Sequence, residues 1–253
     1  MTHAALRDDA RERAGDAIPV VGLIVPPAHG QVPGDGAALY GEDRVRFIAR
    51  GLALGEITTR GYEGVIDRVV GLAGELAGEG ARAVSLMGTS LSFFRGAAFN
   101  AELEAEMARR TGVPCTTMSN AIVRALAAVD VARVAVATAY VDDVNERLCR
   151  YLAANDLAVT AIRGLSITGV GEVAEVPTTT LVELCEAVFA VDRRADGILI
   201  SCGGLLTLEA IAEVEAKLGV PVVSSSPAGF WDVMRVAGLD SESRRGGRLF
   251  RSA

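Results

Sequence analysis

The pattern that most constrains this chain is a regular alternation of short apolar runs and longer amphipathic segments. The apolar runs have the length of strands and are nearly continuous, which is typical of strands covered on both faces. They lie at 19–25, 83–87, 113–116, 134–137, 157–162, 198–201 and 220–223. Helical spacing of apolar residues predicts helices at 62–76, 99–109, 142–152, 178–189 and 206–218. This alternation predicts an α/β fold with parallel strands.

A weak internal repeat divides the chain into two halves. In the first half a strand ends in GTS at 88–90 and the string VPCTTMS follows; in the second a strand ends in CGG at 202–204 and VPVVSSS follows. We therefore expect two similar α/β lobes, each a parallel sheet flanked by helices, with the active-site cleft between them. The expected limits are 18–130 for the first lobe, 131–228 for the second, 229–253 for a segment that packs back on the first, and 1–17 for a polar tail.

Charge and hydropathy exclude several classes of protein. The net charge is −7 and no basic cluster is present, which argues against a nucleic-acid partner. No apolar run approaches the roughly 20 residues that span a bilayer, and the charged first residues do not form a secretory signal. We expect a monomeric, cytoplasmic protein that acts on a small molecule and has no membrane partner.

The scarcity of some residue types limits cofactor chemistry. The single lysine, Lys217, lies in a helical run, where a solvated position is the simpler interpretation than a Schiff base. The two histidines, His3 and His29, are far apart and no metal-binding spacing is present. We therefore expect neither a metal nor an organic cofactor. The cysteines are scattered, as in a protein with reduced thiols: Cys115, Cys149, Cys185 and Cys202.

Cys202 is the most informative residue, because it ends an apolar strand and two glycines and a helical run follow it. Glycines let the backbone approach a ligand, and N–H groups at a helix start bind anions. The alternative is a small buried core cysteine. For Cys115, Cys149 and Cys185, which lie within strand or helix patterns, we expect the core position.

The matching segment of the first half, Gly88-Thr89-Ser90, has two hydroxyls and a turn that suit a carboxylate or an oxyanion. Helix capping by Thr89 or Ser90 is the alternative. Tyr140 follows a strand and could donate a hydrogen bond into the same cleft, or it could be a surface tyrosine. Pro26 follows the first strand, where it could line a pocket or only end the strand. The glycine pairs do not match a nucleotide-binding motif.

Four strings closely resemble the bacterial arylmalonate decarboxylases: SLMGTSLSFFRGAAFN, TAYVDDVNERL, ILISCGGLLTLEAI and VPVVSSSPAGFWD. The resemblance extends from about residue 20 to about residue 238. These enzymes belong to the aspartate/glutamate racemase superfamily, whose two α/β lobes enclose the site. In the racemases each lobe supplies one cysteine, on opposite faces of the substrate. Here the second-lobe residue is Cys202 and the first-lobe position is Gly88, which distinguishes the decarboxylase pattern from the racemase pattern.

The resemblance implies cofactor-independent decarboxylation of aryl- or alkenyl-substituted malonic acids. An enediolate forms after CO₂ leaves, and Cys202 protonates it on one face to give a chiral acid. Donors to the retained carboxylate are implied at Thr89, Ser90, Tyr140 and the Gly203 N–H. An apolar pocket for the departing carboxylate is implied at Pro26, Leu54, Ile57, Leu91, Val170 and Val173.

Two alternatives share the expected cleft. A racemase or cis–trans isomerase of a small carboxylic acid needs an acid–base group on each face, and Gly88 cannot serve as one. A two-lobed carboxylate-binding protein is typically exported, and no signal is recognisable in the sequence.

Overall fold

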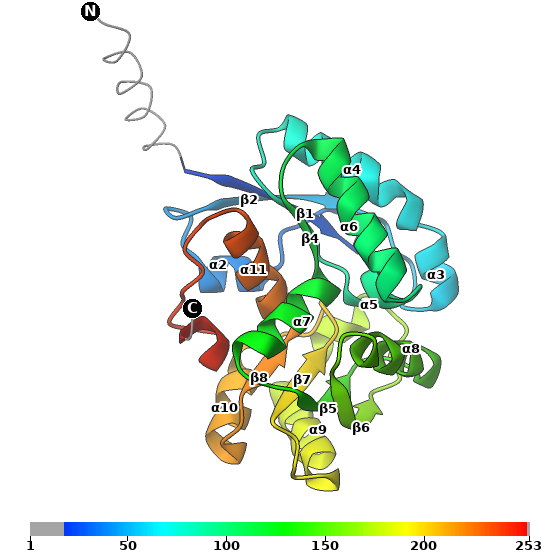
Figure 1. The fold of residues 1–253 in the computed structure, drawn as a ribbon, viewed down its shortest axis with the longest axis vertical. Helices are drawn as coiled ribbons and strands as arrows, with labels where there is room; N and C mark the ends of the chain where they lie inside the picture. Colours follow the sequence, from blue (N-terminus) through cyan, green and yellow to red (C-terminus); the bar gives the residue numbers. More distant parts are fainter. Residues whose placement is uncertain (1–17, 252–253) are drawn as a thin grey trace, which may run out of the picture.

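Two four-stranded parallel sheets, each flanked by helices, carry the fold (Figure 1). The computed structural model describes residues 18–251, so the expected tail at 1–17 lies outside the described residues. The strand order is β2-β1-β3-β4 in one sheet and β6-β5-β7-β8 in the other. The repeated order confirms the predicted class of two similar α/β lobes. It also makes β3 and β7 equivalent, since each lies between the first and the last strand of its half.

The strands are β1 (Val20–Val25), β2 (Arg46–Gly51), β3 (Val84–Leu86), β4 (Cys115–Thr117), β5 (Arg133–Thr138), β6 (Ala158–Gly164), β7 (Gly197–Ser201) and β8 (Val222–Ser224). The α-helices are α2 (Gly34–Leu39), α3 (Thr59–Glu63), α4 (Val69–Gly78), α5 (Thr89–Phe93), α6 (Ala97–Thr111), α7 (Met118–Ala128), α8 (Asp142–Ala153), α9 (Thr178–Val191), α10 (Leu208–Leu218) and α11 (Ser225–Val236). Short 3₁₀ helices are η1 (Ile66–Arg68), η2 (Glu172–Glu175) and η3 (Arg248–Arg251).

The central strands are buried on both faces, as their continuous apolar sequences predict. Every residue of β7, with the sequence GILIS, is buried, and so are all residues of β1 after Val20. Strand β2 was not predicted because its sequence, RFIARG, mixes charged and apolar residues. It is an edge strand and its residues are only partly buried, so charged side chains are tolerated there.

The single helix predicted at 62–76 is wrong, because the segment is divided into α3, η1 and α4. The chain leaves the α conformation at Val65, where φ is −126°. Gly61 lies so close to the Glu56 carbonyl that a Cβ atom would be 2.3 Å from its oxygen. This contact fixes α3 against the preceding loop, whereas α4 packs on β1, β2 and β3.

The last strand of each sheet leads directly into a helix that faces the other lobe. Helix α7 follows β4 and helix α11 follows β8, and the two helices pack against each other in the middle of the molecule (Figure 1). Helix α11 also contacts α2 and β4 of the first half. Further along, the Tyr40 hydroxyl donates a hydrogen bond to the Ser241 carbonyl at 3.0 Å. The lobe limits given above, including the segment 229–253, stay a prediction.

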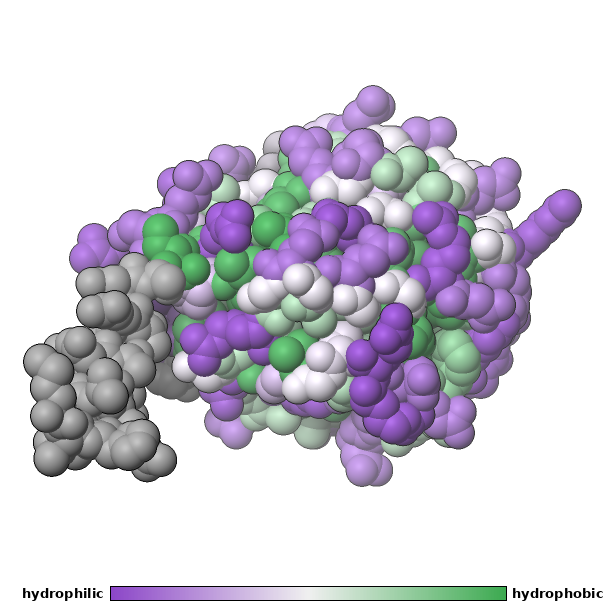
Figure 2. All heavy atoms as spheres, turned by 90° about the horizontal axis from the view of Figure 1, so that it is seen from above, coloured by the Kyte–Doolittle hydropathy of each residue, from purple (hydrophilic) through white to green (hydrophobic). Residues whose placement is uncertain are grey.

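Hydrophilic and apolar side chains are mixed over the surface of the molecule that Figure 2 shows. On the face drawn in Figure 2, hydrophilic side chains surround small, separate apolar patches. None of the helices between residues 18 and 251 combines the length and the apolarity that crossing a bilayer requires. Within the described residues, the large apolar side chains that are most exposed are Ile18, Val191 and Leu206.

Candidate active site

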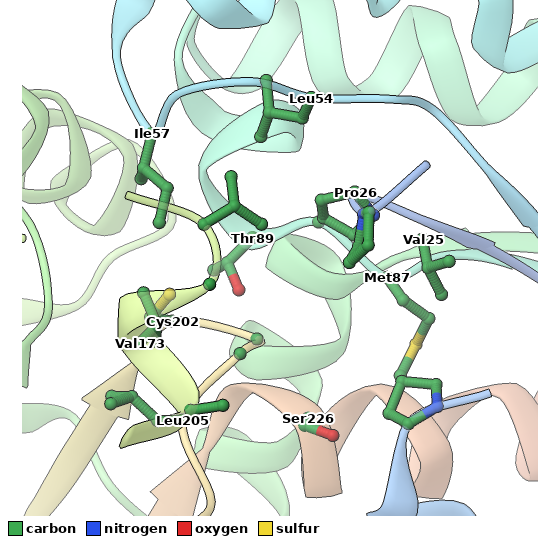
Figure 3. Close-up of a pocket in the computed structure, with 18 of the residues that line it drawn as sticks. Val25, Pro26, Leu54, Ile57, Met87, Thr89, Val173, Cys202, Leu205 and Ser226 are labelled. Carbon is green, nitrogen blue, oxygen red and sulfur yellow. The ribbon is translucent and has the colours of Figure 1, made fainter. Parts of the chain in front are cut away.

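A cavity of about 560 Å³ lies between the lobes, at the carboxyl ends of the strands. Its lining residues come from the segments that follow β1, β2 and β3 in the first lobe and β5, β6, β7 and β8 in the second (Figure 3). The lining includes every site residue that the sequence singled out, namely Pro26, Leu54, Ile57, Gly88, Thr89, Ser90, Leu91, Tyr140, Val170, Val173, Cys202 and Gly203. The structure therefore brings all of these residues together, whereas their individual roles stay predictions.

Cys202 lies directly after β7, and its side chain is enclosed by the protein with 6% of its surface exposed. Its backbone N–H donates a hydrogen bond to Ser225 Oγ at 3.2 Å, which ties this loop to the start of α11. Burial raises the pKa of the Cys202 thiol to about 11, although hydrogen bonds from the Gly204 backbone and the Tyr140 side chain lower it. The group is therefore a thiol at neutral pH, as a proton donor must be.

Helix α10 begins at Leu208, close to the start at 206 that the sequence predicts. Residues 203 and 204 form a turn and residue 205 a bend, so an irregular segment separates Cys202 from the first residue of α10. The helix dipole therefore has little effect on the thiol, since the dipole acts mainly within the first turn of a helix. The equivalent segment of the first lobe differs, because α5 begins at Thr89, immediately after Gly88.

Tyr140 is fully buried, so the surface position considered for it is wrong. The Ser201 hydroxyl donates a hydrogen bond to the Tyr140 oxygen at 3.5 Å, and the Phe93 ring packs edge-on at 5.9 Å. Burial raises the pKa of Tyr140 well above its usual value, and the neighbouring Cys202 raises it further. The phenol therefore keeps its proton and can donate it in a hydrogen bond.

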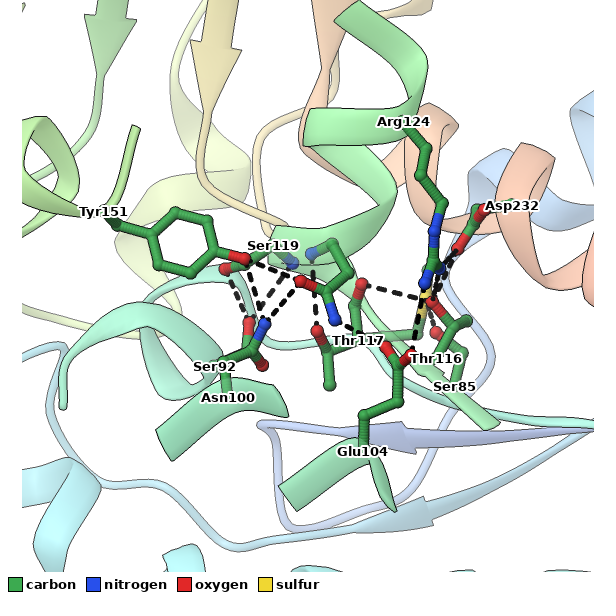
Figure 4. Close-up of polar contacts among 12 residues, drawn as sticks. Ser85, Ser92, Asn100, Glu104, Thr116, Thr117, Ser119, Arg124, Tyr151 and Asp232 are labelled. Atoms are coloured by element: carbon green, nitrogen blue, oxygen red, sulfur yellow. Dashed lines mark hydrogen bonds and ion pairs between the residues drawn. The ribbon is translucent and has the colours of Figure 1, made fainter. Parts of the chain in front are cut away.

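Hydroxyl groups of Ser92 and Ser119, which lie side by side in Figure 4, hold the backbone of Gly88 and Thr89. Ser92 Oγ lies 3.0 Å from the Gly88 oxygen and 2.6 Å from Ser119 Oγ. Ser119 Oγ in turn donates to the Thr89 oxygen at 2.9 Å. Both serines are buried, so these bonds are shielded from competing water. The Thr89 side chain itself donates to Met118 Sδ at 2.8 Å.

A second polar cluster joins the lobes beside these serines. Tyr151 on α8 donates to the Asn120 side-chain oxygen at 2.8 Å, and Asn100 Nδ2 donates to both of them, at 2.9 Å and 2.8 Å (Figure 4). Because Tyr151 also packs on Phe93, the ring beside Tyr140, this cluster positions the second-lobe donor against the first lobe.

Tyr62 is a site residue that the sequence analysis missed. It is fully buried, and burial raises its pKa while the Ser90 side chain lowers it. Among the described residues, none meets the Tyr62 hydroxyl in hydrogen-bond geometry, so the hydroxyl keeps a free donor near Ser90. Its only signal in the sequence was a place at the start of an apolar helical run, which indicates a core residue.

Two loops, one from each lobe, form the apolar side of the cavity. The Leu54 N–H donates to the Pro26 oxygen at 2.8 Å, which joins two wall residues of the first lobe. The Ile57 N–H donates to the Thr168 oxygen at 2.9 Å, next to an isolated antiparallel bridge between Glu56 and Gly169. These bonds hold the Leu54–Ile57 wall against the loop that carries Val170 and Val173.

In the described part of the chain, no three or more His, Cys, Asp and Glu side chains lie together in a group that could hold a metal ion. Beside the Pro26, Leu54 and Ile57 wall, the cavity offers hydroxyls, backbone N–H groups and one thiol as donors, and His29 and Gln31 also line it. This set suits an anionic carboxylate and a developing oxyanion.

A family model, a curated relative and a solved structure that match this chain all carry the name arylmalonate decarboxylase. A family model described as arylmalonate decarboxylase matches residues 21–250. The arylmalonate decarboxylase of Bordetella bronchiseptica is 59% identical over 233 residues, which cover 92% of this chain and 96% of that protein. One similar solved structure is a liganded crystal structure of an arylmalonate decarboxylase mutant, in which one glycine is changed to cysteine and one cysteine to serine. It has a TM-score of 0.91 at 58% sequence identity, and the match covers 93% of this chain and 100% of that chain.

The maleate isomerase of Pseudomonas putida has a TM-score of 0.84 at 21% identity, covering 92% of this chain and 98% of that chain. At this identity the likeness shows only that the fold is shared.

Proposed function

Because the chain belongs to the arylmalonate decarboxylase family, we propose that it removes one carboxylate from aryl- or alkenyl-substituted malonic acids and that Cys202 protonates the enediolate that remains. The observation that carries this proposal is the buried thiol of Cys202, which has a pKa of about 11 and lies in the same cavity as the Tyr140, Thr89 and Ser90 hydroxyls. A thiol that stays protonated beside several neutral donors can supply a proton to a carbanion.

The substrate is a dianion with both carboxylates on one carbon. One carboxylate accepts hydrogen bonds from Thr89, Ser90, Tyr140 and the Gly203 N–H, where its charge is stabilised. The other carboxylate is directed to the apolar wall of Leu54, Ile57 and Val173, where a charge is poorly solvated. Loss of CO₂ removes this charge and shifts the electron pair toward the donors, so the transition state is stabilised more than the ground state.

The C–C bond breaks and its electron pair forms the enediolate. The C–H bond of the product forms with the proton of the Cys202 thiol, and the thiolate that remains is reprotonated from solvent. Among the described residues that line the cavity, Cys202 is the only cysteine. A single proton donor on one face gives a product of one handedness. A racemase or isomerase that needs two thiols is not supported by this lining.

The direct test is an assay of phenylmalonate with protein dialysed against EDTA and no added cofactor. The proposal predicts equal amounts of CO₂ and phenylacetate, and no conversion of maleate to fumarate. Isomerisation of maleate without CO₂ release would contradict it. The monomeric state, the cytoplasmic location and the absence of a cofactor stay predictions.

A further inference from the structure

Asp35 is a buried carboxyl group on the wall of the same cavity, and the mechanism does not use it. It is the second residue of α2, its exposed fraction is 6%, and it lines the cavity together with Val32 and Pro33. Within residues 18–251 no arginine, lysine or histidine forms an ion pair with it, although burying an unpaired carboxylate is costly. The stability of the fold therefore does not explain why the Asp35 carboxyl group is buried at this place.

The contact that compensates this burial is weak. Ser226, in the first turn of α11, is the one side chain whose hydrogen bonding lowers the pKa of Asp35, and desolvation outweighs it and raises that pKa. Ser226 Oγ is buried, and none of residues 18–251 meets it in hydrogen-bond geometry. Ser226 lines the cavity too (Figure 3). The two side chains together leave hydrogen-bonding capacity unused at this part of the wall.

This part of the cavity is separate from the reacting end. Cys202 raises the pKa values of Tyr62 and Tyr140, whereas the pKa of Asp35 is shifted by burial and by Ser226. In Figure 3, Ser226 lies on the opposite side of the cavity from Ile57 and Leu54, well away from the Cys202 thiol. A cavity of about 560 Å³ extends from one end to the other, which leaves room for the substituent of a malonate beyond its carboxylates.

Building on the proposed function, we propose that Asp35 is a specificity-determining residue that contacts the outer end of the aryl substituent and favours rings carrying a hydrogen-bond donor, such as a hydroxyl or an amino group. The donor supplies the partner that the carboxylate lacks, and hydrogen bonds to charged groups are the stronger kind. The same negative charge repels an anionic substituent. It also repels the malonate carboxylates, which directs them to the Thr89 and Tyr140 end.

The test compares kcat/KM for 4-hydroxyphenylmalonate and 4-methoxyphenylmalonate, since the two substituents have similar electronic effects but only the hydroxyl donates. The wild type should prefer the hydroxyl compound about tenfold, the value of one hydrogen bond to a charged group. In Asp35→Asn this preference should fall to about threefold or less, because a neutral acceptor binds the donor more weakly. The variant should also turn over 4-carboxyphenylmalonate about tenfold better than the wild type does.

Glu42→Gln is the matched control, because it removes one negative charge from the exposed loop after α2. It should leave both ratios unchanged. If the wild type shows no preference for the hydroxyl compound, or if Asp35→Asn keeps both ratios, the inference is wrong. The comparison of the hydroxyl and methoxy compounds with the wild type tests the inference even if the Asp35→Asn variant does not fold. A wild type that decarboxylates none of these acids, nor phenylmalonate, would instead refute the proposed function.

Discussion

Tyr140 and Cys202 line one cavity, and each group changes the ionisation of the other in the opposite direction. Tyr140 lowers the pKa of Cys202, whereas a negative charge on Cys202 raises the pKa of Tyr140. Burial raises both pKa values, so both groups hold their protons at neutral pH. One group can then transfer its proton to carbon while the other donates a hydrogen bond to an oxyanion.

The first prediction concerns the reactivity of this thiol. With the pKa of Cys202 raised from 9.0 to about 11, only about one molecule in a hundred carries the thiolate at pH 9. Because the thiolate is the form that reacts, alkylation of Cys202 by iodoacetamide should rise about tenfold per pH unit and level off near pH 11. Mass spectrometry of the peptide that contains Cys202 measures the rate. A rate that levels off near pH 9 would show that the pKa of the thiol is not shifted upward.

Replacing Tyr140 by phenylalanine should impair catalysis while keeping the fold. The change removes one donor to the oxyanion, which costs about 10²–10³ in kcat at sites of this kind. It also removes the hydrogen bond that lowers the pKa of Cys202, so the pKa of that thiol should rise further. Steady-state kinetics and the alkylation profile measure the two effects separately. A Tyr140→Phe variant with unchanged kcat would mean that the phenol does not contact the developing charge.

Ser119→Ala should show that catalysis depends on the hydrogen bond that holds the Thr89 backbone in place. Ser119 Oγ donates to the Thr89 oxygen at 2.9 Å in a buried position, so its loss should lower kcat about tenfold with a small effect on KM. Thr160→Val is the control, because Thr160 Oγ1 bonds to the Val134 carbonyl in the second lobe, away from the cavity. The interpretation would be wrong if both variants lost activity only in proportion to a lower melting temperature.

Cys202→Ala should abolish turnover with little change in stability. The side chain is small and lies after the end of a strand, so the truncation should cost only about 1 kcal/mol of unfolding free energy. Cys149→Ala removes a half-buried thiol on α8 and should stay fully active. Circular dichroism and CO₂ release test both variants. Wild-type turnover in a folded Cys202→Ala protein would assign the proton transfer to another group.

Much of the site follows from the sequence because strand ends in parallel sheets meet at one edge. Gly88 and Cys202 each follow an apolar strand, so the repeat was enough to place both on one cavity. Edge strand β2 gave no such signal, because a partly buried strand has no continuous apolar run.

The residues that the sequence did not indicate act through tertiary contacts. Tyr62 resembles an ordinary core residue, and only the packing of α3 brings its hydroxyl to Ser90. Asp35 lies in the string VPGDGA, which indicates a turn rather than a helix. Its burial results from the contact between α2 and α11, two helices far apart in the sequence. Local patterns cannot predict such contacts.

Gly88 offers a direct test of the central claim that Cys202 alone sets the face of protonation. Gly88 follows β3 and Cys202 follows the equivalent strand β7, so the two residues belong to opposite lobes of one cavity. The Gly88 backbone, with φ −129°, accepts any side chain. A new Cβ atom would lie 2.7 Å from Leu91 Cδ1, so this side chain must move and turnover should be slower.

The decisive measurement is chiral chromatography of the acid that the double variant Gly88→Cys, Cys202→Ala forms from methyl(phenyl)malonate. The account predicts slow turnover and a product of opposite handedness to that of the wild type, because the proton then comes from the first lobe. Gly88→Cys alone, with thiols on both faces, should lower the enantiomeric purity. An active double variant that gives the wild-type handedness would contradict the claim that Cys202 determines the face of protonation.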